Sequence, residues 1–402
     1  MDKLHADTMA RKNAWRIAFA GLMTLATAMG IGRFAFTPLL PMMLHDGSIT
    51  LNYGGWLATA NYLGYFAGAM LCAIWRGLPP IATIRAGLLS TIVLTLGMGL
   101  LDMPSLWLLM RFLSGVASAL VFVYGSSWCL QQLTHLGYPA MGGIIFCGPG
   151  IGIMLTGLAT GSMVSHHWNS ASGWLAFGAL AIVLTLLVWR IYHDDHSTQP
   201  AASTRQPTAA ISETAGLKKE IRLQVLAYGL AGFGYIITAT FLPVIARQAL
   251  PNSVWPDFFW PLFGLCVALG AFGATRFPVH YDQRKLLAAS YLTQACGVLI
   301  SAVFPNEAGF AVSSILLGLP FTAITLFAMR EARRLRPEHT SSLMGLMTAS
   351  YGLGQIAGPP LATQLVHQTG SFTASLSIAA AALLLGAVFY YKMTRTTPTA
   401  AS

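Results

Sequence analysis

Twelve long apolar runs divide this chain of 402 residues, and each is about long enough to cross a lipid bilayer as a helix. A helix needs about 20 predominantly apolar residues to span the hydrocarbon core. Lipid offers no partner for exposed backbone N–H and C=O groups, so only helices and closed barrels cross it. Barrel strands are short and alternate in polarity, unlike these unbroken runs. The sequence therefore predicts an all-α integral membrane protein with 12 transmembrane helices.

Composition supports this prediction. Charged residues make up only 9% of the chain, hydrophobic residues make up 55%, and the mean hydropathy is +0.62. Soluble domains carry about 25% charged residues. The predicted spans cover residues 15–37, 53–75, 84–101, 104–128, 140–163, 172–190, 221–245, 256–276, 285–304, 308–330, 341–366 and 371–391.

The net charge of +10 is distributed in a way that predicts orientation and gives no sign of a nucleic-acid partner. If the N-terminus is cytoplasmic, 20 of the 23 Lys and Arg residues lie on the cytoplasmic side, and only Arg247 lies outside. The other two, Arg33 and Arg111, fall within spans. Basic residues concentrate in the cytoplasmic loops of membrane proteins. We therefore predict a multi-pass protein of the inner cell membrane with both termini in the cytoplasm.

The second group of six spans repeats features of the first. Gly30, Gly32 and Pro41 recur as Gly232, Gly234 and Pro243, all at an offset of 202. Residues 148–149 and 358–359 are both Gly-Pro, one pair in the fifth span and the other in the eleventh. Duplicated six-helix halves are typical of secondary transporters. We predict an N-terminal six-helix bundle over 1–190, a polar cytoplasmic linker over 191–220 and a C-terminal six-helix bundle over 221–402.

These features resemble the major facilitator superfamily over nearly the whole chain. Arg111 and Gly115 match its Arg-x-x-x-Gly signature in the fourth span, and residues 148–152 are similar to its Gly-Pro motif. The stretch 30–41 resembles the YbfB/YjiJ-like branch. The resemblance implies two pseudo-symmetric bundles that rock about a shared central site. It also implies gating by two inner loops, whose charged residues are Arg76, Arg85, Arg276, Asp282, Arg284 and Lys285. The first loop lacks the acidic residue of the family motif.

Two intramembrane arginines are the first candidates for substrate contact, because a charge within a membrane usually has a task or a partner. Arg33 and Arg111 are expected at similar depth, with no Asp or Glu at mid-membrane. A guanidinium group binds carboxylate or phosphate with two hydrogen bonds. In the alternative interpretation, Arg33 extends to the outer interface and Arg111 donates to backbone carbonyls of neighbouring helices.

Further polar side chains recur at helical spacing within the spans. Each is a candidate for lining the solute pathway, and each has the alternative of a helix-packing role. These residues are Asn61 and Tyr65 in the second span, Tyr228 and Tyr235 in the seventh, and Tyr351 and Gln355 in the eleventh. Tyr235 occupies the position equivalent to Arg33. Gly148, Pro149, Gly358 and Pro359 are predicted to let helices bend or pack closely.

The predicted function is secondary active transport of a small organic solute by alternating access, driven by an ion or counter-substrate gradient. The two arginines favour an anion. Proton-coupled efflux of drugs or metabolites is the alternative, and a non-transporting membrane sensor is a more remote one. We predict no enzymatic activity, metal or cofactor, because the histidines lie in loops and no phosphate-binding loop is present. The expected partners are the lipid bilayer and a small-molecule substrate, and the protein is expected to be a monomer.

Overall fold

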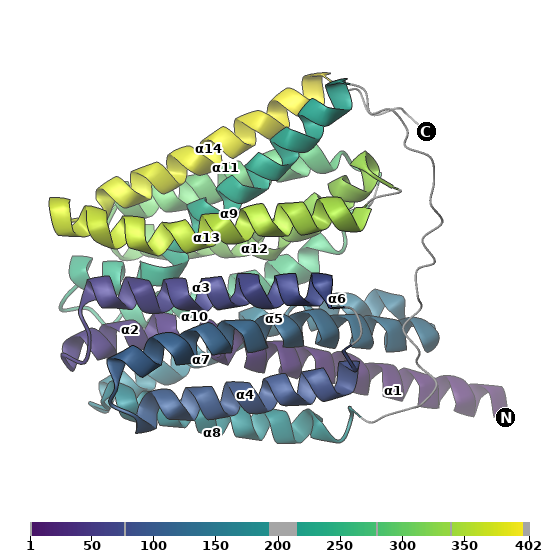
Figure 1. The fold of residues 1–402 in the computed structure, drawn as a ribbon, viewed down its shortest axis with the longest axis horizontal. Coiled ribbons are helices and arrows are strands. Elements are labelled where there is room, and N and C mark those ends of the chain that lie inside the picture. The colour runs from purple at the N-terminus through teal and green to yellow at the C-terminus, as the bar shows by residue number, and fades with distance from the viewer. Residues whose placement is uncertain (1, 76–77, 193–214, 279, 338–339, 397–402) are drawn as a thin grey trace.

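The computed structural model describes residues 2–75, 78–192, 215–278, 280–337 and 340–396. All regular elements within these ranges are helical (Figure 1). The first half contains α1 (Asp2–Leu25), the π-helical segment η1 (Ala26–Ile31), α2 (Phe36–His45), α3 (Leu51–Ile74), α4 (Pro80–Leu100), α5 (Pro104–His135), the 3-10 turn η2 (Pro139–Met141), α6 (Gly142–Ile145), α7 (Gly148–Ser165) and α8 (Ser170–Trp189). The second half contains α9 (Ala215–Ala249), α10 (Pro256–Ala274), α11 (Gln283–Val303), α12 (Glu307–Leu335), α13 (Thr340–Thr369) and α14 (Thr373–Thr396).

The predicted spans correspond to these helices. Within the described ranges, 11 helical stretches are long and apolar enough to cross a membrane. The remaining predicted span, 341–366, lies within α13, which has 30 residues but contains many Gly, Ser, Thr and Gln residues. Its length still suffices to span, because a helix rises about 1.5 Å per residue. The protein is therefore a multi-pass membrane protein.

Close helix packing within each half depends on glycines. A Cβ atom on Gly64 of α3 would lie 1.9 Å from the carbonyl oxygen of Phe112 on α5. In the second half, a Cβ atom on Gly232 of α9 would lie 2.2 Å from the carbonyl oxygen of Tyr351 on α13. Small residues let helices in membranes approach until their backbones touch. The α3–α5 and α9–α13 pairs are such contacts, one in each half.

The two halves meet along a seam formed by α2 and α3 with α9 and α13, and by α7 with α10. Figure 1 shows α1 beginning and α14 ending at the same end of the bundle, which we call the termini end; the opposite end is the far end. At this seam the Thr37 hydroxyl donates to the carbonyl of Ala239 (3.2 Å). These residues are 202 positions apart, which is the offset of the sequence repeat. Equivalent positions of the two copies thus meet where the halves join.

The first spanning segment is interrupted where its copy is continuous. After η1 the chain passes through a turn over residues 32–35 before α2 begins. In the second half, α9 runs as one helix from Ala215 to Ala249. The interruption lies beside a tight contact, because a Cβ atom on Gly30 would lie 2.4 Å from Cα of Gly152 on α7. The two copies therefore differ at the position of Arg33.

Candidate solute-binding site

The interrupted first span leaves backbone carbonyls without helical partners, and side chains of α5 replace those partners. Arg111 donates through Nη1 to the carbonyl of Gly32 (3.2 Å) and through Nη2 to the carbonyl of Arg33 (3.0 Å). The Ser114 hydroxyl also donates to the Gly32 carbonyl (2.6 Å). Non-helical backbone is tolerated at membrane depth only when protein groups satisfy it. Arg111 thereby holds the turn that carries Arg33.

Arg33 is a buried cation without an anionic partner. Arg33 is only 3% exposed, and its Nε and Nη2 atoms have no hydrogen-bond acceptor among the described residues. Its guanidinium carbon lies 4.0 Å from the ring centroid of Tyr65, 5.2 Å from that of Tyr62 and 5.3 Å from that of Phe34. Such cation–π contacts stabilise a guanidinium by about 2 kcal/mol when water is excluded. The Nε and Nη2 groups at the edge of the guanidinium are therefore buried donors without a partner among the described residues.

Aromatic rings of both halves surround this cation. Phe34 contacts Phe321 of α12 (centroids 6.2 Å apart), and Phe321 contacts Tyr235 of α9 (4.9 Å). Tyr235 in turn stacks on Tyr351 of α13 (5.8 Å). We call the set the ring cluster; it consists of Phe34, Tyr62, Tyr65, Tyr228, Tyr235, Trp260, Phe263, Phe321 and Tyr351. The cluster joins the two halves around Arg33.

Part of the ring cluster retains accessible surface near the middle of the bundle. Tyr65, Phe321 and Tyr351 are half-buried, whereas Tyr62 and Tyr235 are each only 3% exposed. Tyr65 follows Tyr62 by three residues toward the termini end of α3. Tyr351 likewise lies in the termini-end half of α13. Tyr65 therefore lies on the termini side of Tyr62, and Tyr351 packs against Tyr228, which is itself only 3% exposed.

The far side of the cluster is closed by polar contacts between the halves. The Tyr62 hydroxyl and the Thr240 hydroxyl are 2.8 Å apart. Closer to the far end, the Thr363 hydroxyl donates to Oδ1 of Asn52 (3.3 Å). Together with the bond from Thr37 to α9, these contacts join α2 and α3 to α9 and α13 on the far side of Arg33.

The structure brings four of the predicted pathway residues into one cluster and gives the others local contacts. Tyr65, Tyr228, Tyr235 and Tyr351 belong to the ring cluster, and Arg33 lies over the ring of Tyr65. Gln355 donates its amide to the Tyr235 hydroxyl. The Tyr228 hydroxyl donates to that of Thr325 (3.2 Å). Asn61 is fully buried and donates to the carbonyl of Arg111 (3.0 Å). Its amide group thus joins α3 to α5.

Two of the predicted gating residues of the second half, Asp282 and Arg284, are part of a charge network at the termini end. Arg284 is fully buried and donates to both carboxylate oxygens of Asp282 (3.0 and 3.1 Å) and to Glu220 (3.3 Å). Glu331 accepts from Arg334 (2.7 Å) and lies 4.0 Å from Arg284. All five residues belong to the second half, so the network holds α9, α11 and α12 together. Glu220 and Glu331 were not predicted from the sequence. Each is an acidic residue about one helical turn from basic residues near the end of a span, and this pattern could have revealed them.

The network also changes the acidity of Asp282, which precedes α11 outside the spanning segment. Burial alone would raise the pKa of this carboxyl group. The hydrogen bonds and the positive charge of Arg284, with a smaller effect of Lys285, outweigh burial and lower the pKa below its ordinary value. Asp282 is therefore held in its charged form.

The other predicted loop residues make separate contacts. Arg85 lies over the ring of Trp189 (4.9 Å) and donates to the carbonyl of Tyr192. Arg276 lies over the ring of Phe272 (4.5 Å), and Lys285 is exposed. Arg76 lies outside the described residues.

The predicted bending residues occupy two different settings. Gly148 and Pro149 form the first turn of α7, directly after a turn that separates it from α6. A Cβ atom on Gly148 would lie 2.3 Å from the carbonyl oxygen of Leu22, so this glycine allows close contact with α1. Pro359 lies within the continuous helix α13, preceded by Gly358, where a Cβ atom would lie 2.4 Å from the Ile236 side chain.

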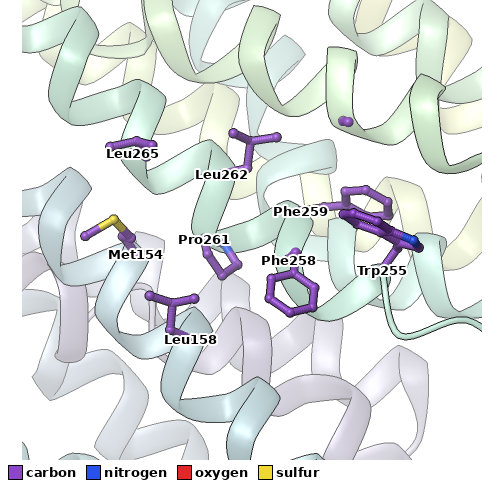
Figure 2. A pocket seen from close by; sticks show the side chains of 9 residues that line it. Met154, Leu158, Trp255, Phe258, Phe259, Pro261, Leu262 and Leu265 are labelled. Atoms are coloured by element: carbon purple, nitrogen blue, oxygen red, sulfur yellow. The ribbon is translucent and has the colours of Figure 1, made fainter.

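A separate apolar groove lies on the seam between α7 and α10 (Figure 2). Its volume is about 340 Å³, and it is lined by Met154, Leu158, Trp255, Phe258, Phe259, Pro261, Leu262, Leu265 and Ala311. Phe258 and Leu265 are each at least 41% exposed, whereas Trp260 of the ring cluster is 1% exposed. The groove is therefore on the outer surface of the bundle and has no charged residue in its lining.

Two six-helix halves that meet at a central seam form the architecture of many secondary transporters of membranes. The family model described as "Uncharacterised MFS-type transporter YbfB" matches residues 25–391, so the chain belongs to this family of major facilitator superfamily transporters. This result confirms the family and the fold predicted from the sequence, and with it a transporter rather than an enzyme.

Individual relatives agree with the family. The chain is 24% identical over 385 residues to an "Uncharacterized MFS-type transporter YceJ" of Bacillus subtilis (strain 168), covering 92% of this chain and 94% of that one. A "Probable sugar efflux transporter" of Helicobacter pylori (strain HPAG1) is 24% identical over 224 residues, which is 54% of each chain. The chain thus spans about half the length of that relative.

A solved structure shows the same fold. A crystal structure of the nucleoside transporter NupG superimposes with a TM-score of 0.71 at 14% identity, covering 94% of this chain and 99% of that one. At this level of identity, the likeness concerns the arrangement of the helices alone.

Proposed function

We propose that this protein is a secondary active transporter of the inner membrane that carries a small organic solute with an anionic group. The observation that supports the anion is the buried Arg33, whose Nε and Nη2 atoms have no acceptor among the described residues. A charged side chain within the membrane costs roughly 2.5–3.5 kcal/mol on insertion scales. A carboxylate that accepts two hydrogen bonds from the guanidinium would offset this cost. The ligand itself thus supplies the missing counter-charge.

The position of the site between the two halves supports alternating access. We propose that both termini are cytoplasmic, on the basis of the distribution of Lys and Arg, so that the termini end faces the cytoplasm. In the conformation described here, the half-buried Tyr65 then lies on the cytoplasmic side of Tyr62, and the half-buried Tyr351 lies in the cytoplasmic half of α13. The contact between Tyr62 and Thr240 lies on the opposite side. Rocking of the halves would break that contact and expose the site outward, driven by an ion or counter-substrate gradient.

Export of the solute from the cytoplasm is a second, more specific candidate function. The half-buried Tyr65 and Tyr351 on the proposed cytoplasmic side favour loading from the cytoplasm. The printed name of the partial relative from Helicobacter pylori, a probable sugar efflux transporter, also favours efflux. Sugars are neutral, however, and would leave the Arg33 guanidinium without a counter-charge. We therefore propose an anion as the exported class.

A ligand screen followed by transport tests this function. Ligands that bind only the folded state raise its apparent stability. The purified protein is screened by thermal shift against matched anionic, cationic and neutral metabolites, and the best ligand is then used for counterflow in proteoliposomes. We expect the hits to be anions and the radiolabelled hit to exchange across the membrane. Hits confined to cations would refute the anion site. A bound anion that no gradient or counter-ligand moves would refute transport and favour a sensor.

A charge variant connects the hit to the proposed site. Replacing Arg33 by Gln removes a charged hydrogen bond of about 1.5–3 kcal/mol, so the affinity for the anion falls roughly 10- to 150-fold. The matched control is Arg276→Gln, because Arg276 also lies over an aromatic ring but at the termini end of α10. We expect the control to bind as the wild type does. Equal affinity of Arg33→Gln and wild type would exclude Arg33 as the anchor.

A further inference from the structure

We infer that the transported solute is a flat aromatic monocarboxylate without an ammonium group. This specificity rests on the proposed function, because it takes Arg33 as the group that binds the anion. Two features of the site lead to it: the number of free charges next to the ligand, and the kind of surface that is still accessible there.

The charges at the site provide for one negative group. Arg33 forms no ion pair with any described residue, and its Nε and Nη2 atoms lack acceptors. Arg111 is the second cation nearby, but its two terminal nitrogens already donate to backbone carbonyls, and only its buried Nε has no acceptor among the described residues. A second carboxylate on the ligand would therefore find no guanidinium edge with two free N–H groups to pair with. Burying an unpaired charge is strongly unfavourable.

A positively charged group on the ligand finds no counter-charge either. The buried carboxylates Glu220 and Glu331 are in the charge network of the second half, paired with Arg284 and Arg334. Aromatic faces also attract cations, but the guanidinium of Arg33 already lies 4.0 Å from the ring centroid of Tyr65. An ammonium group placed on the same rings would be repelled by Arg33. Zwitterions such as amino acids should thus bind less well than the corresponding simple acids.

The accessible surface beside Arg33 is aromatic. The half-buried members of the ring cluster are Tyr65 of α3, Phe321 of α12 and Tyr351 of α13, so both halves contribute. Tyr351 and Tyr235 stack with their planes 23° apart, and Phe321 meets Tyr235 edge-on. Rings in this arrangement accept a further ring by stacking or by edge-to-face contact. A planar aromatic ligand gains such contacts, whereas a saturated ring of the same size does not.

A series of matched acids tests this specificity. Dissociation constants of the purified protein are measured by calorimetry for benzoate, cyclohexanecarboxylate, benzamide and phthalate, and for 3-phenylpropionate against phenylalanine. Benzoate should bind roughly tenfold more tightly than cyclohexanecarboxylate, because each aromatic contact contributes up to about a tenfold gain. Benzoate should also exceed benzamide and phthalate by at least tenfold, and 3-phenylpropionate should exceed phenylalanine by the same factor.

The possible failures point to different steps. Equal binding of benzoate and cyclohexanecarboxylate, or binding of other organic anions with none of the aromatic acids, would overturn the aromatic specificity and leave the anion site intact. Equal binding of 3-phenylpropionate and phenylalanine, or of benzoate and phthalate, would overturn the restriction to one negative charge. Equal binding of benzoate and benzamide would overturn the anion site, and with it the proposed function.

Two substitutions separate the contribution of the rings from that of the charge. Tyr351→Leu should abolish the preference for benzoate over cyclohexanecarboxylate while the preference for benzoate over benzamide persists. Arg33→Gln should have the opposite effect. Tyr391→Leu is the control, because Tyr391 is 52% exposed on α14 and lies outside the ring cluster. If Tyr351→Leu does not fold, Phe321→Leu on α12 tests the same rings. An unchanged preference in either folded variant would refute the role of the rings.

Discussion

Replacing Arg111 by Leu should leave the protein folded and weaken its binding of the anion. Arg111 donates two hydrogen bonds to the turn of the first span, one to the Gly32 carbonyl (3.2 Å) and one to the Arg33 carbonyl (3.0 Å). At about 1.5 kcal/mol each, these bonds contribute about 3 kcal/mol. Removing a buried charge from the membrane returns roughly 2.5–3.5 kcal/mol. The two terms nearly cancel, which leaves the cost of the unpaired Arg33 carbonyl, about 1–3 kcal/mol, as the net loss of stability.

The binding site, in contrast, loses the group that positions it. Arg111 is the only described residue that donates to the Arg33 carbonyl, so the turn over residues 32–35 is released. If this release removes one of the two hydrogen bonds between Arg33 and the anion, affinity falls at least about tenfold. Thermal shift gives the stability, and calorimetry with benzoate gives the affinity.

Ser114→Ala is the control for this experiment. Ser114 donates to the same Gly32 carbonyl (2.6 Å), which keeps its bond from Arg111 in this variant. We expect a loss of about 1 kcal/mol in stability and an affinity within threefold of the wild type. Wild-type affinity in Arg111→Leu would refute the positioning role, and a variant that does not fold would refute the cancellation of the two terms.

Three further predictions concern packing and charge. Gly64→Ala places a Cβ atom 1.9 Å from the Phe112 carbonyl oxygen, so it should force α3 and α5 apart and lower the melting temperature sharply. The control Gly345→Ala has no atom within 4 Å of the new Cβ and should not lower it. Equal melting temperatures of the two variants would contradict the contact. The pKa of Asp282 is lowered in the folded state, so the contribution of its charged form to stability is complete above about pH 4 and disappears as the pH falls through that lowered pKa. The difference in melting temperature between wild type and Asp282→Asn should therefore shrink on acidification. A difference that grows on acidification would contradict this prediction. Arg284→Leu leaves buried carboxylates without their cation and should destabilise the protein by roughly 3–5 kcal/mol, measured by denaturant unfolding; a loss below 1 kcal/mol would show that the network adds little.

The fold could be predicted from the sequence because lipid leaves few alternatives to long apolar helices. The predicted spans 53–75 and 104–128 correspond to Leu51–Ile74 and Pro104–His135, and the errors lie mainly where helices extend beyond the membrane. The linker remains a prediction, since residues 193–214 lie outside the described ranges and α9 already begins at Ala215. The interruption of the first span was not predicted. Its two glycines recur in α9, which is continuous, so glycine alone does not determine a break.

The candidate site could be predicted only in part. The rarity of charge within spans identified Arg33 and Arg111, and helical spacing identified Tyr65, Tyr235 and Tyr351. The sequence could not show which arginine donates to protein groups, because this depends on the interrupted backbone. The carbonyls that the turn leaves without helical partners accept hydrogen bonds from Arg111. The partners Phe321 and Trp260 come from helices distant in sequence, and apolar aromatic residues within a span carry no signal of their own.

The most direct test of the account is a structure of the protein determined with a bound aromatic carboxylate, such as benzoate. The quantity to measure is the distance from the ligand's carboxylate oxygens to Nε and Nη2 of Arg33. We predict about 2.7–2.9 Å for these charged hydrogen bonds, with the ligand ring against Tyr65, Phe321 or Tyr351. A carboxylate bound elsewhere, with the Arg33 guanidinium still unpaired, would contradict the proposed site.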